Sequence, residues 1–239
     1  MNARALPLYA TILIFVVAYA LAYSQFPNIL STRVIGNLLT DNAYLGIVAV
    51  GMTLVILSGG IDLSVGAVIA FSGVFIAVML RDTGLHPLAV FAVLLALTTA
   101  FGAAMGFLID RLAMPAFIVT LAGMFLARGA AYLLSVQSVP ITHPFFGQLQ
   151  GAYVLMPGKG RLTLIGVLML AVFAVGMVIA HRTRFGTSVY ALGGGAQTAR
   201  LMGVPQGRTT VLVYGFSGLM AGLSGIVFAV YTGSGYSLA

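Results

Sequence analysis

Apolar stretches separated by short polar segments fill most of this 239-residue chain. A bilayer core is crossed by about 20 apolar residues in a helix, and nearly every stretch here reaches that length. The exception is 43–58, which is short and runs into Gly59-Gly60. We therefore expect an all-α fold, a polytopic transmembrane helical bundle of about seven spans. The predicted spans are 6–24, 43–58, 61–80, 88–109, 112–135, 162–180 and 211–231.

Two polar segments between these spans carry structural signals of their own. In 25–42, apolar residues recur at helical spacing, which predicts a short interfacial helix. The segment 136–161 is rich in Pro, Gly, His and Gln, and it is either an ordered, turn-rich cap or a flexible lid. The first span could be a secretory signal ending near Ala20-Leu21-Ala22, but its apolar run is longer than the typical ~7 to 15 residues. We expect it to remain as an uncleaved helix.

Composition excludes several classes of protein. The chain is 61% hydrophobic and 6% charged, with a mean hydropathy of +1.11, so it lacks the polar surface of a soluble domain. Its formal charge is +7, but the basic residues are scattered at segment ends with no stripe interleaved with aromatics, so we expect no nucleic-acid partner. The absence of cysteine excludes disulfides, thiolate metal ligands and thiol nucleophiles. We expect neither a metal nor a cofactor.

The densest positive charge lies between the last two spans and orients the chain. Residues 181–210 carry four arginines and no acid. Loops rich in Lys and Arg stay on the cytoplasmic side, so we predict a cytoplasmic N-terminus. The margin is modest and rests on this one loop: Arg4, Arg111, Arg182, Arg184, Arg200 and Arg208 fall inside, against Arg33, Arg81, Lys159 and Arg161 outside.

The most unusual local sequence is Ser58 to Gly66, which places Asp62 between two apolar spans. Two glycines can end one helix, and Asp62 or Ser64 can cap the next, which predicts a broken helix. An Asp at the centre of a membrane helix costs about 2.5 to 3.5 kcal/mol, so Asp62 must cap, pair or face water. Capping and direct contact with a transported solute both remain open. Arg128, inside the span 112–135, either faces inward, with Asp62 as a possible partner, or extends to the outer interface.

Glycine and serine patterns have simpler interpretations. Gly102-x3-Gly106 and Gly218-x3-Gly222 predict close helix packing. Two Gly-x-Ser-Gly strings, at 215–218 and 222–225, suggest an intramembrane serine hydrolase, but no histidine follows them to act as a base. The strings around Lys159 and at 193–195 lack the Gly-x4-Gly-Lys-Ser/Thr spacing of a phosphate-binding loop, so we expect no ATP bound by this chain.

The basic loop contains a candidate interaction element. Residues 196–202 can form a short helix that ends at Gly203, with Pro205 beyond it and Arg200 on its surface. The segment is either a shaped docking element or an ordinary basic connector, and its Gly and Pro punctuation favours the first.

At these residues the sequence resembles the permease subunits of bacterial ABC importers for simple sugars, in the ribose, xylose, arabinose and galactofuranose branch. Segments 139–144 and 180–186 most resemble one of the two permeases of a galactofuranose importer. The resemblance covers the chain almost from end to end. The matching strings are GMTLVI at 51–56, GGIDLSVG at 59–66, MPAFIVTLAGM at 114–124, YALGG at 190–194 and ARLMGV at 199–204.

The resemblance implies that 199–204 is the coupling helix received by a cytoplasmic ATPase subunit. It also implies a second permease subunit across the pore and a periplasmic sugar-binding protein. Gly195 stands where relatives usually carry Asn, which affects the cap of this helix. Relatives also continue through further helices, so we expect 1–239 to be a single permease domain that lacks them. The coupling-loop residues are Gly193, Gly194, Ala199, Arg200, Leu201, Gly203 and Val204.

We therefore hypothesise a multi-pass permease of the bacterial inner membrane, surrounded by membrane lipid, that passes a monosaccharide when a partner hydrolyses ATP. Neutral sugars are held by amides, hydroxyls and aromatics, and the chain offers several near its spans. An ion-coupled secondary transporter or channel using Asp62 and Arg128 is the alternative. The candidates for the translocation path are Asn42, Tyr44, Thr53, Asp62, Ser64, Thr120, Arg128 and Tyr132.

Overall fold

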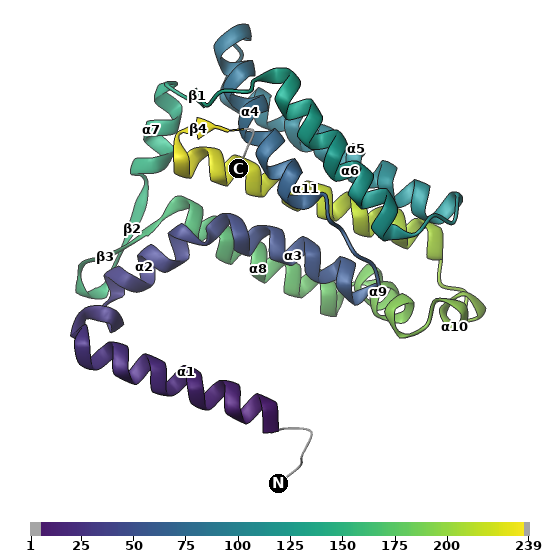
Figure 1. Ribbon diagram of the computed structural model, residues 1–239, viewed down its shortest axis with the longest axis horizontal. Helices are drawn as coiled ribbons and strands as arrows, with labels where there is room; N and C mark the ends of the chain where they lie inside the picture. Colours follow the sequence, from purple (N-terminus) through teal and green to yellow (C-terminus); the bar gives the residue numbers. More distant parts are fainter. Residues whose placement is uncertain (1–5, 237–239) are drawn as a thin grey trace.

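The computed structural model describes residues 6–236 and is almost entirely helical (Figure 1). Arg4, which entered the charge count above, and the chain end at 237–239 lie outside the described residues. The long helices are α1 (Leu6–Gln25), α3 (Ala43–Leu57), α4 (Val65–Thr83), α5 (Pro87–Arg111), α6 (Ala116–Leu134), α8 (Leu164–Arg182) and α11 (Gln206–Thr232). The shorter ones are η2 (Pro27–Leu30), α2 (Thr32–Asp41), α7 (Pro144–Gly151), η3 (Pro157–Lys159), α9 (Arg184–Gly194) and α10 (Ala196–Leu201).

Six of these helices are long and apolar enough to cross a membrane, and a bent pair brings the number to seven within the described residues. The pair is α2 and α3, which meet at Asn42 with a bend of 57°. The predicted polytopic bundle of about seven spans is thereby confirmed. The short helix predicted within 25–42 corresponds to α2, whose first turn is capped by the Ser31 hydroxyl accepting from the Val34 N–H at 3.4 Å.

Three spans begin later than the apolar pattern predicted. α4 begins at Val65 instead of residue 61, because 60–64 is non-helical. α6 begins at Ala116 after Pro115, which disfavours helical geometry in the residue before it. α8 begins at Leu164 because the residues before it pair as a strand. Apolar composition marks the membrane segment, but local backbone geometry decides where the helix starts.

The bundle has two differently built ends (Figure 1). At one end, the α10 end, α9 and α10 connect α8 to α11. At the other, the α7 end, β1 (Val139–Pro140) pairs antiparallel with β4 (Ser234–Gly235), and β2 (Tyr153–Met156) pairs with β3 (Gly160–Thr163). The segment 136–161 is therefore an ordered cap. α1 projects away from the other helices, and none of residues 8–25 is buried.

Helices α5 and α11 pack closely because glycines face each other across their contact. A Cβ on Gly102 would collide with the carbonyl oxygen of Tyr214, and one on Gly218 would collide with that of Thr98. A Cβ on Gly218 would also lie 3.2 Å from the Cα of Gly102. Both small-x3-small patterns thus serve helix packing, as the sequence predicted. This contact makes α11 a central helix of the bundle, and 15 of its residues, from Thr209 to Val230, are buried.

Candidate functional site

The break between α3 and α4 is built around the buried side chain of Asp62, which is 2% exposed. Its Oδ1 accepts from the Ser64 backbone N–H at 2.9 Å and from the Ser64 hydroxyl at 2.6 Å. Its Oδ2 accepts from the Ser217 hydroxyl of α11 at 2.7 Å. A buried carboxylate is tolerated only when its oxygens are hydrogen-bonded, and both are bonded here. Asp62 therefore fixes the turn into α4 and joins it to α11.

A second set of contacts holds the backbone beside Asp62. The carbonyl oxygen of Ile61 accepts from the Tyr214 hydroxyl at 3.1 Å and from Thr120 Oγ1 at 3.5 Å. Tyr214 and Ser217 lie one turn apart on α11, and sequence reasoning assigned neither a role at this break. Ser217 belongs to one of the Gly-x-Ser-Gly strings, which was the only signal for it. The break is thus tied to α6 and α11.

Before the break, α3 ends in a glycine stop. Gly59 has a φ of +83°, its N–H donates to the Ile56 carbonyl at 2.9 Å, and the Gly60 N–H donates to the Val55 carbonyl at 2.9 Å. This is the Schellman arrangement, in which a glycine with positive φ satisfies the last carbonyls of a helix. The predicted helix break is therefore present. The capping of α4 differs from the prediction. Ser64 is the N-cap residue of α4, but its side chain makes no cap bond. Its hydroxyl donates to Asp62 instead.

The other translocation-path candidates are distributed over several surfaces. Asn42, at the bend between α2 and α3, donates to the Leu38 carbonyl at 2.9 Å. Tyr44 packs against Phe228 with ring centroids 4.9 Å apart, and Thr53 is exposed on α3. On α6, Arg128 is exposed and Tyr132 partly so. Asp62, Ser64 and Thr120 are the three candidates that the structure brings together, and all three are buried.

The charged candidates Asp62 and Arg128 form no ion pair. Both carboxylate oxygens of Asp62 are bonded to serines, whereas Arg128 lies on the exposed face of α6. Within residues 6–236, an ion pair is formed by Arg81 and Asp82, at the α7 end, with Arg81 Nε 2.6 Å from Asp82 Oδ1. The possible partnership raised from the sequence is therefore absent in this conformation.

The α9–α10 element consists of two consecutive short helices and has an exposed tip. The Ala199 N–H donates to the Gly195 carbonyl at 2.9 Å to start α10, and Gly195 supplies no side-chain cap. At its end, Gly203 has a φ of +82°, with Gly203 N–H to Arg200 carbonyl and Val204 N–H to Ala199 carbonyl bonds of 3.0 Å each. The predicted helix ending at Gly203 is confirmed.

The surface of α10 is divided between a buried anchor and an exposed tip. Ala199 is 0% exposed, whereas Leu201 is 85% and Met202 70% exposed, and Arg200 is exposed beside them. Protein–protein interfaces have an apolar centre and a polar rim. The two apolar side chains and the adjacent cation of α10 have this composition. Arg200, Leu201 and Met202 are called the α10 tip below.

Gly193 connects this element to the α3–α4 break. A Cβ on Gly193 would collide with the carbonyl oxygen of Leu57, the last residue of α3, and would lie 3.6 Å from the Gly59 backbone nitrogen. Only a glycine allows α9 to approach the α3 terminus this closely. The end of α9 and the glycine stop of α3 are therefore in backbone contact. Gly194, by contrast, has open space around it.

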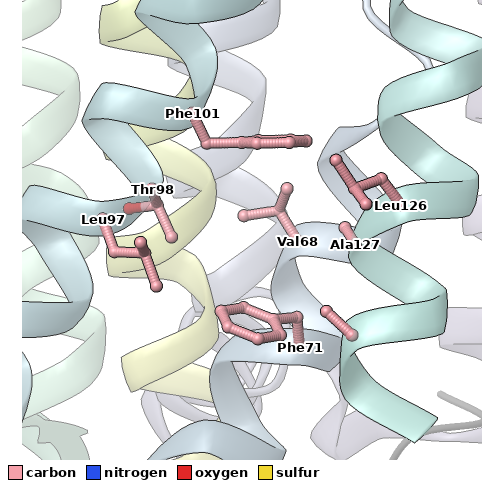
Figure 2. Close-up of a pocket in the computed structure, with 8 residues that line it drawn as sticks. Val68, Phe71, Leu97, Thr98, Phe101, Leu126 and Ala127 are labelled. Carbon is pink, nitrogen blue, oxygen red and sulfur yellow. The ribbon is translucent and has the colours of Figure 1, made fainter. Parts of the chain in front are cut away.

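The pocket between α4, α5 and α6 is apolar and unsuited to a sugar (Figure 2). It has a volume of about 280 Å³. Its one polar side chain is Thr98, whose hydroxyl already donates to the Leu95 carbonyl at 3.3 Å. Sugar sites need several converging hydrogen-bonding groups. The lining residues are Val68, Phe71, Leu97, Thr98, Phe101, Leu126, Ala127 and Ala130.

Comparison with known proteins gives a consistent set of relatives. The chain is 57% identical over 236 residues to the inner membrane ABC transporter permease protein YjfF of Escherichia coli K12, covering 99% of this chain and 71% of that protein. It is 36% identical to the fructose import permease protein FruG of Bifidobacterium longum NCC 2705 (98% and 70% covered). It is 33% identical to the ribose import permease protein RbsC of Escherichia coli K12 (91% and 67% covered). No solved structure matches the chain.

The match to a family extends over most of the fold described above. Residues 34–238 match the family described as "Branched-chain amino acid transport system / permease component", a range that contains the α3–α4 break, the α9–α10 element and the α5–α11 contact. The relatives above are named as ABC transporter or sugar import permeases, and each aligns over more than nine-tenths of this chain. The chain therefore belongs to this family of transport-system permease components.

Proposed function

We propose that the chain is the membrane-spanning permease subunit of an ATP-binding-cassette importer that passes a monosaccharide into the cytoplasm. The relatives named for fructose and ribose import support a sugar as the substrate. The resemblance at 139–144 and 180–186 makes galactofuranose the first sugar to test. The chain itself carries no phosphate-binding loop, so ATP hydrolysis belongs to a separate cytoplasmic subunit.

The observation that carries this proposal is the α10 tip and its support. Leu201 and Met202 are exposed while Ala199 anchors the helix, so the tip offers apolar surface to a partner without unfolding. Gly193 holds the same element against the end of α3. A motor subunit that displaced the α10 tip would therefore push directly on the α3–α4 break. In this proposal Gly193, Gly194, Ala199, Arg200, Leu201, Gly203 and Val204 form the coupling element.

Orientation and the other partners follow from the same proposal. The α10 end faces the cytoplasm, together with the N-terminus, because the basic residues of 181–210 gather there. The α7 end then faces the periplasm and receives a sugar-binding protein. A second permease subunit completes the pore. Asn42, Tyr44, Thr53, Arg128 and Tyr132 are candidates for the path, whereas Asp62, Ser64 and Thr120 shape the backbone beside it.

The test is Arg200→Glu in the transporter assembled with its partners. In this proposal Arg200 meets acidic groups of the ATPase subunit. Reversing its charge should reduce ATP-dependent sugar uptake about tenfold or more, because a like-charge contact at an interface costs several kcal/mol. Uptake and co-purification of the ATPase subunit are measured together. Arg200→Lys keeps the charge and serves as the matched control, for which near-normal uptake is expected.

Two outcomes would contradict this assignment. Unchanged uptake in Arg200→Glu would show that α10 is not where the motor docks. Uptake that continues without ATP but stops when the proton gradient is collapsed would favour the ion-coupled alternative. The geometry does not favour that alternative, because Asp62 is fully bonded and has no contact with Arg128.

A further inference from the structure

A basic groove lies at the α7 end, between α2 and the β2–β3 hairpin. It has a volume of about 720 Å³. Arg33 and Asn37, one turn apart on α2, form one wall, and Lys159 and Arg161 of the hairpin form the other. All four side chains are exposed. The remaining lining residues are Leu155 and Met156.

The three cations of this groove have no carboxylate partner within the described residues. Arg161 does have an aromatic contact, with its guanidinium carbon 4.6 Å from the centre of the Tyr153 ring. A stacked guanidinium keeps its edge N–H groups free to donate. Three like charges around one groove repel one another, so the groove is suited to an anion that accepts several hydrogen bonds.

The walls of the groove are held in place by backbone packing. A Cβ on Gly36 would collide with the carbonyl oxygen of Arg161, and a Cβ on Gly160 would lie 2.7 Å from the backbone of Thr32. The hydroxyls of Thr40 and Thr163 are hydrogen-bonded at 2.8 Å further along the same contact. Lys159 itself has a φ of +64°, which is uncommon for a residue with a side chain. The groove is therefore preformed by two elements in close contact.

Apolar side chains accompany the cations in this region. Leu155, which is 70% exposed, lines the groove together with Met156, and Ile35 and Leu38 are 46% and 56% exposed on other faces of α2. A helix with basic residues beside an exposed apolar face is typical of the membrane interface. A protein with an acidic surface is the alternative occupant, and the experiment below distinguishes it from a lipid. The combination fits a molecule with an anionic head and apolar chains.

From these contacts we infer that the groove between α2 and the β2–β3 hairpin binds the phosphate head of an anionic phospholipid. Arg33, Lys159 and Arg161 donate to the phosphate oxygens, and Asn37 donates to the glycerol head. The acyl chains lie along the apolar side chains of Leu155 and Met156, which line the groove. This site shares no residue with the sugar path or the coupling element, so its test is independent of the test of the proposed function.

The test is native mass spectrometry of the purified chain in detergent with added phosphatidylglycerol. The double variant Arg33→Gln/Arg161→Gln should weaken phosphatidylglycerol binding about 25-fold, since each cation near a membrane surface contributes about fivefold to anionic lipid binding. Because the groove is one site, the wild-type chain should retain about one more phosphatidylglycerol molecule than this variant. Phosphatidylcholine should show no such difference.

Matched variants separate the site from general effects of charge and folding. Arg33→Lys/Arg161→Lys keeps both charges and should retain the lipid, and an unchanged unfolding temperature of Arg33→Gln/Arg161→Gln excludes unfolding as the cause of its lipid loss. Arg182→Gln/Arg184→Gln removes two charges at the α10 end and should leave the groove lipid bound. Equal lipid retention in Arg33→Gln/Arg161→Gln and wild type would overturn the inference. Displacement of the lipid by millimolar inorganic phosphate would also overturn it. So would an Arg33→Gln/Arg161→Gln variant that retains phosphatidylglycerol but no longer binds a protein with an acidic surface.

Discussion

Helices α3 and α10 end in the same way, yet they lead into different surroundings. The stop after α3 is Gly59, with φ +83° and a bond of 2.9 Å from the Gly60 N–H to the Val55 carbonyl. The stop after α10 is Gly203, with φ +82° and a bond of 3.0 Å from the Val204 N–H to the Ala199 carbonyl. In both, a glycine with positive φ closes the last turn.

Beyond these stops, burial separates the two regions. After Gly59 the chain enters the interior, where Asp62 and Ser64 are 2% and 1% exposed and the Asp62 carboxylate accepts from the Ser217 hydroxyl of α11. Around Gly203 the chain stays at the surface. Leu201 and Met202, just before the stop, are largely exposed, and Pro205, just beyond it, is exposed. One backbone motif thus serves a rigid junction in one place and an accessible tip in the other. The difference arises from the side chains around the stop.

Removing the carboxylate of Asp62 should have the largest effect, because it deprives the rigid junction of its acceptor. In Asp62→Ala, the buried Ser64 N–H and two buried serine hydroxyls lose their partner. Each bond to a charged group contributes about 1.5 to 3 kcal/mol, so we expect about 2 to 4 kcal/mol of destabilisation after partial rearrangement. Thermal unfolding of the purified chain in detergent measures it.

Two substitutions sharpen this result. Asp62→Asn keeps the shape and one acceptor oxygen, so it should lose distinctly less stability than Asp62→Ala. Asp82→Ala removes an exposed carboxylate whose partner is the neighbouring Arg81 and should leave the unfolding temperature unchanged. Equal destabilisation by the alanine variants at 62 and 82 would show that the Asp62 bonds do not hold the junction.

The sequence predicted local features of both regions well, because glycine marks them directly. The break after Ser58, the helix ending at Gly203 and the packing of α5 against α11 all depend on glycines, which have a positive φ or stand where a Cβ would collide. Hydrophobic periodicity and length supplied the number of spans. These are properties of short segments, and a single sequence contains them.

The partners of Asp62 could not be predicted in this way. Ser217 lies 155 positions from Asp62, and Tyr214 lies 153 positions from Ile61, so only the packing of α11 against the break brings them together. The same limit applies to Arg128, whose place within an apolar span did not reveal that its side chain is exposed on α6. Which face of an apolar helix is buried depends on neighbours, because such a helix is apolar all round.

A smaller effect is expected at the exposed stop. Gly203→Ala places a Cβ on a residue at φ +82°, and left-handed geometry costs an L-residue about 1 to 2 kcal/mol. Because the surface around α10 is open, we expect this cost to appear as local fraying of α10 and not as global unfolding. Hydrogen exchange at the amides of Met202, Gly203 and Val204 measures it.

The control for this variant is Gly194→Ala, a few residues away in α9. Gly194 is helical and nothing lies within 4 Å of a Cβ built on it, so the added methyl group should leave exchange unchanged or slightly slower. Faster exchange throughout the protein in Gly203→Ala would show that the α10 stop is as tightly coupled to the core as the Asp62 junction, and the contrast between the two regions would fail.

The smallest effect is expected from giving α10 the side-chain cap that it lacks. Gly195 is the N-cap residue, its backbone is extended, and a Cβ there would meet Thr198 Oγ1 at an ordinary 3.7 Å. Asn at this position can accept from the N–H of Gln197 or Thr198, and Asn exceeds Gly as an N-cap by only a few tenths of a kcal/mol, roughly. Gly195→Asn should therefore slow hydrogen exchange at these two amides by about twofold, while Gly195→Ala, which adds a Cβ without an acceptor, should not. The unfolding temperature should stay the same in both, because α10 is anchored to the bundle through Ala199 and not through its first turn. If Asn protects these amides no better than Ala does, then the first turn of α10 is already fixed by the contact of Gly193 with α3, and the α10 tip moves as one body with the helix break.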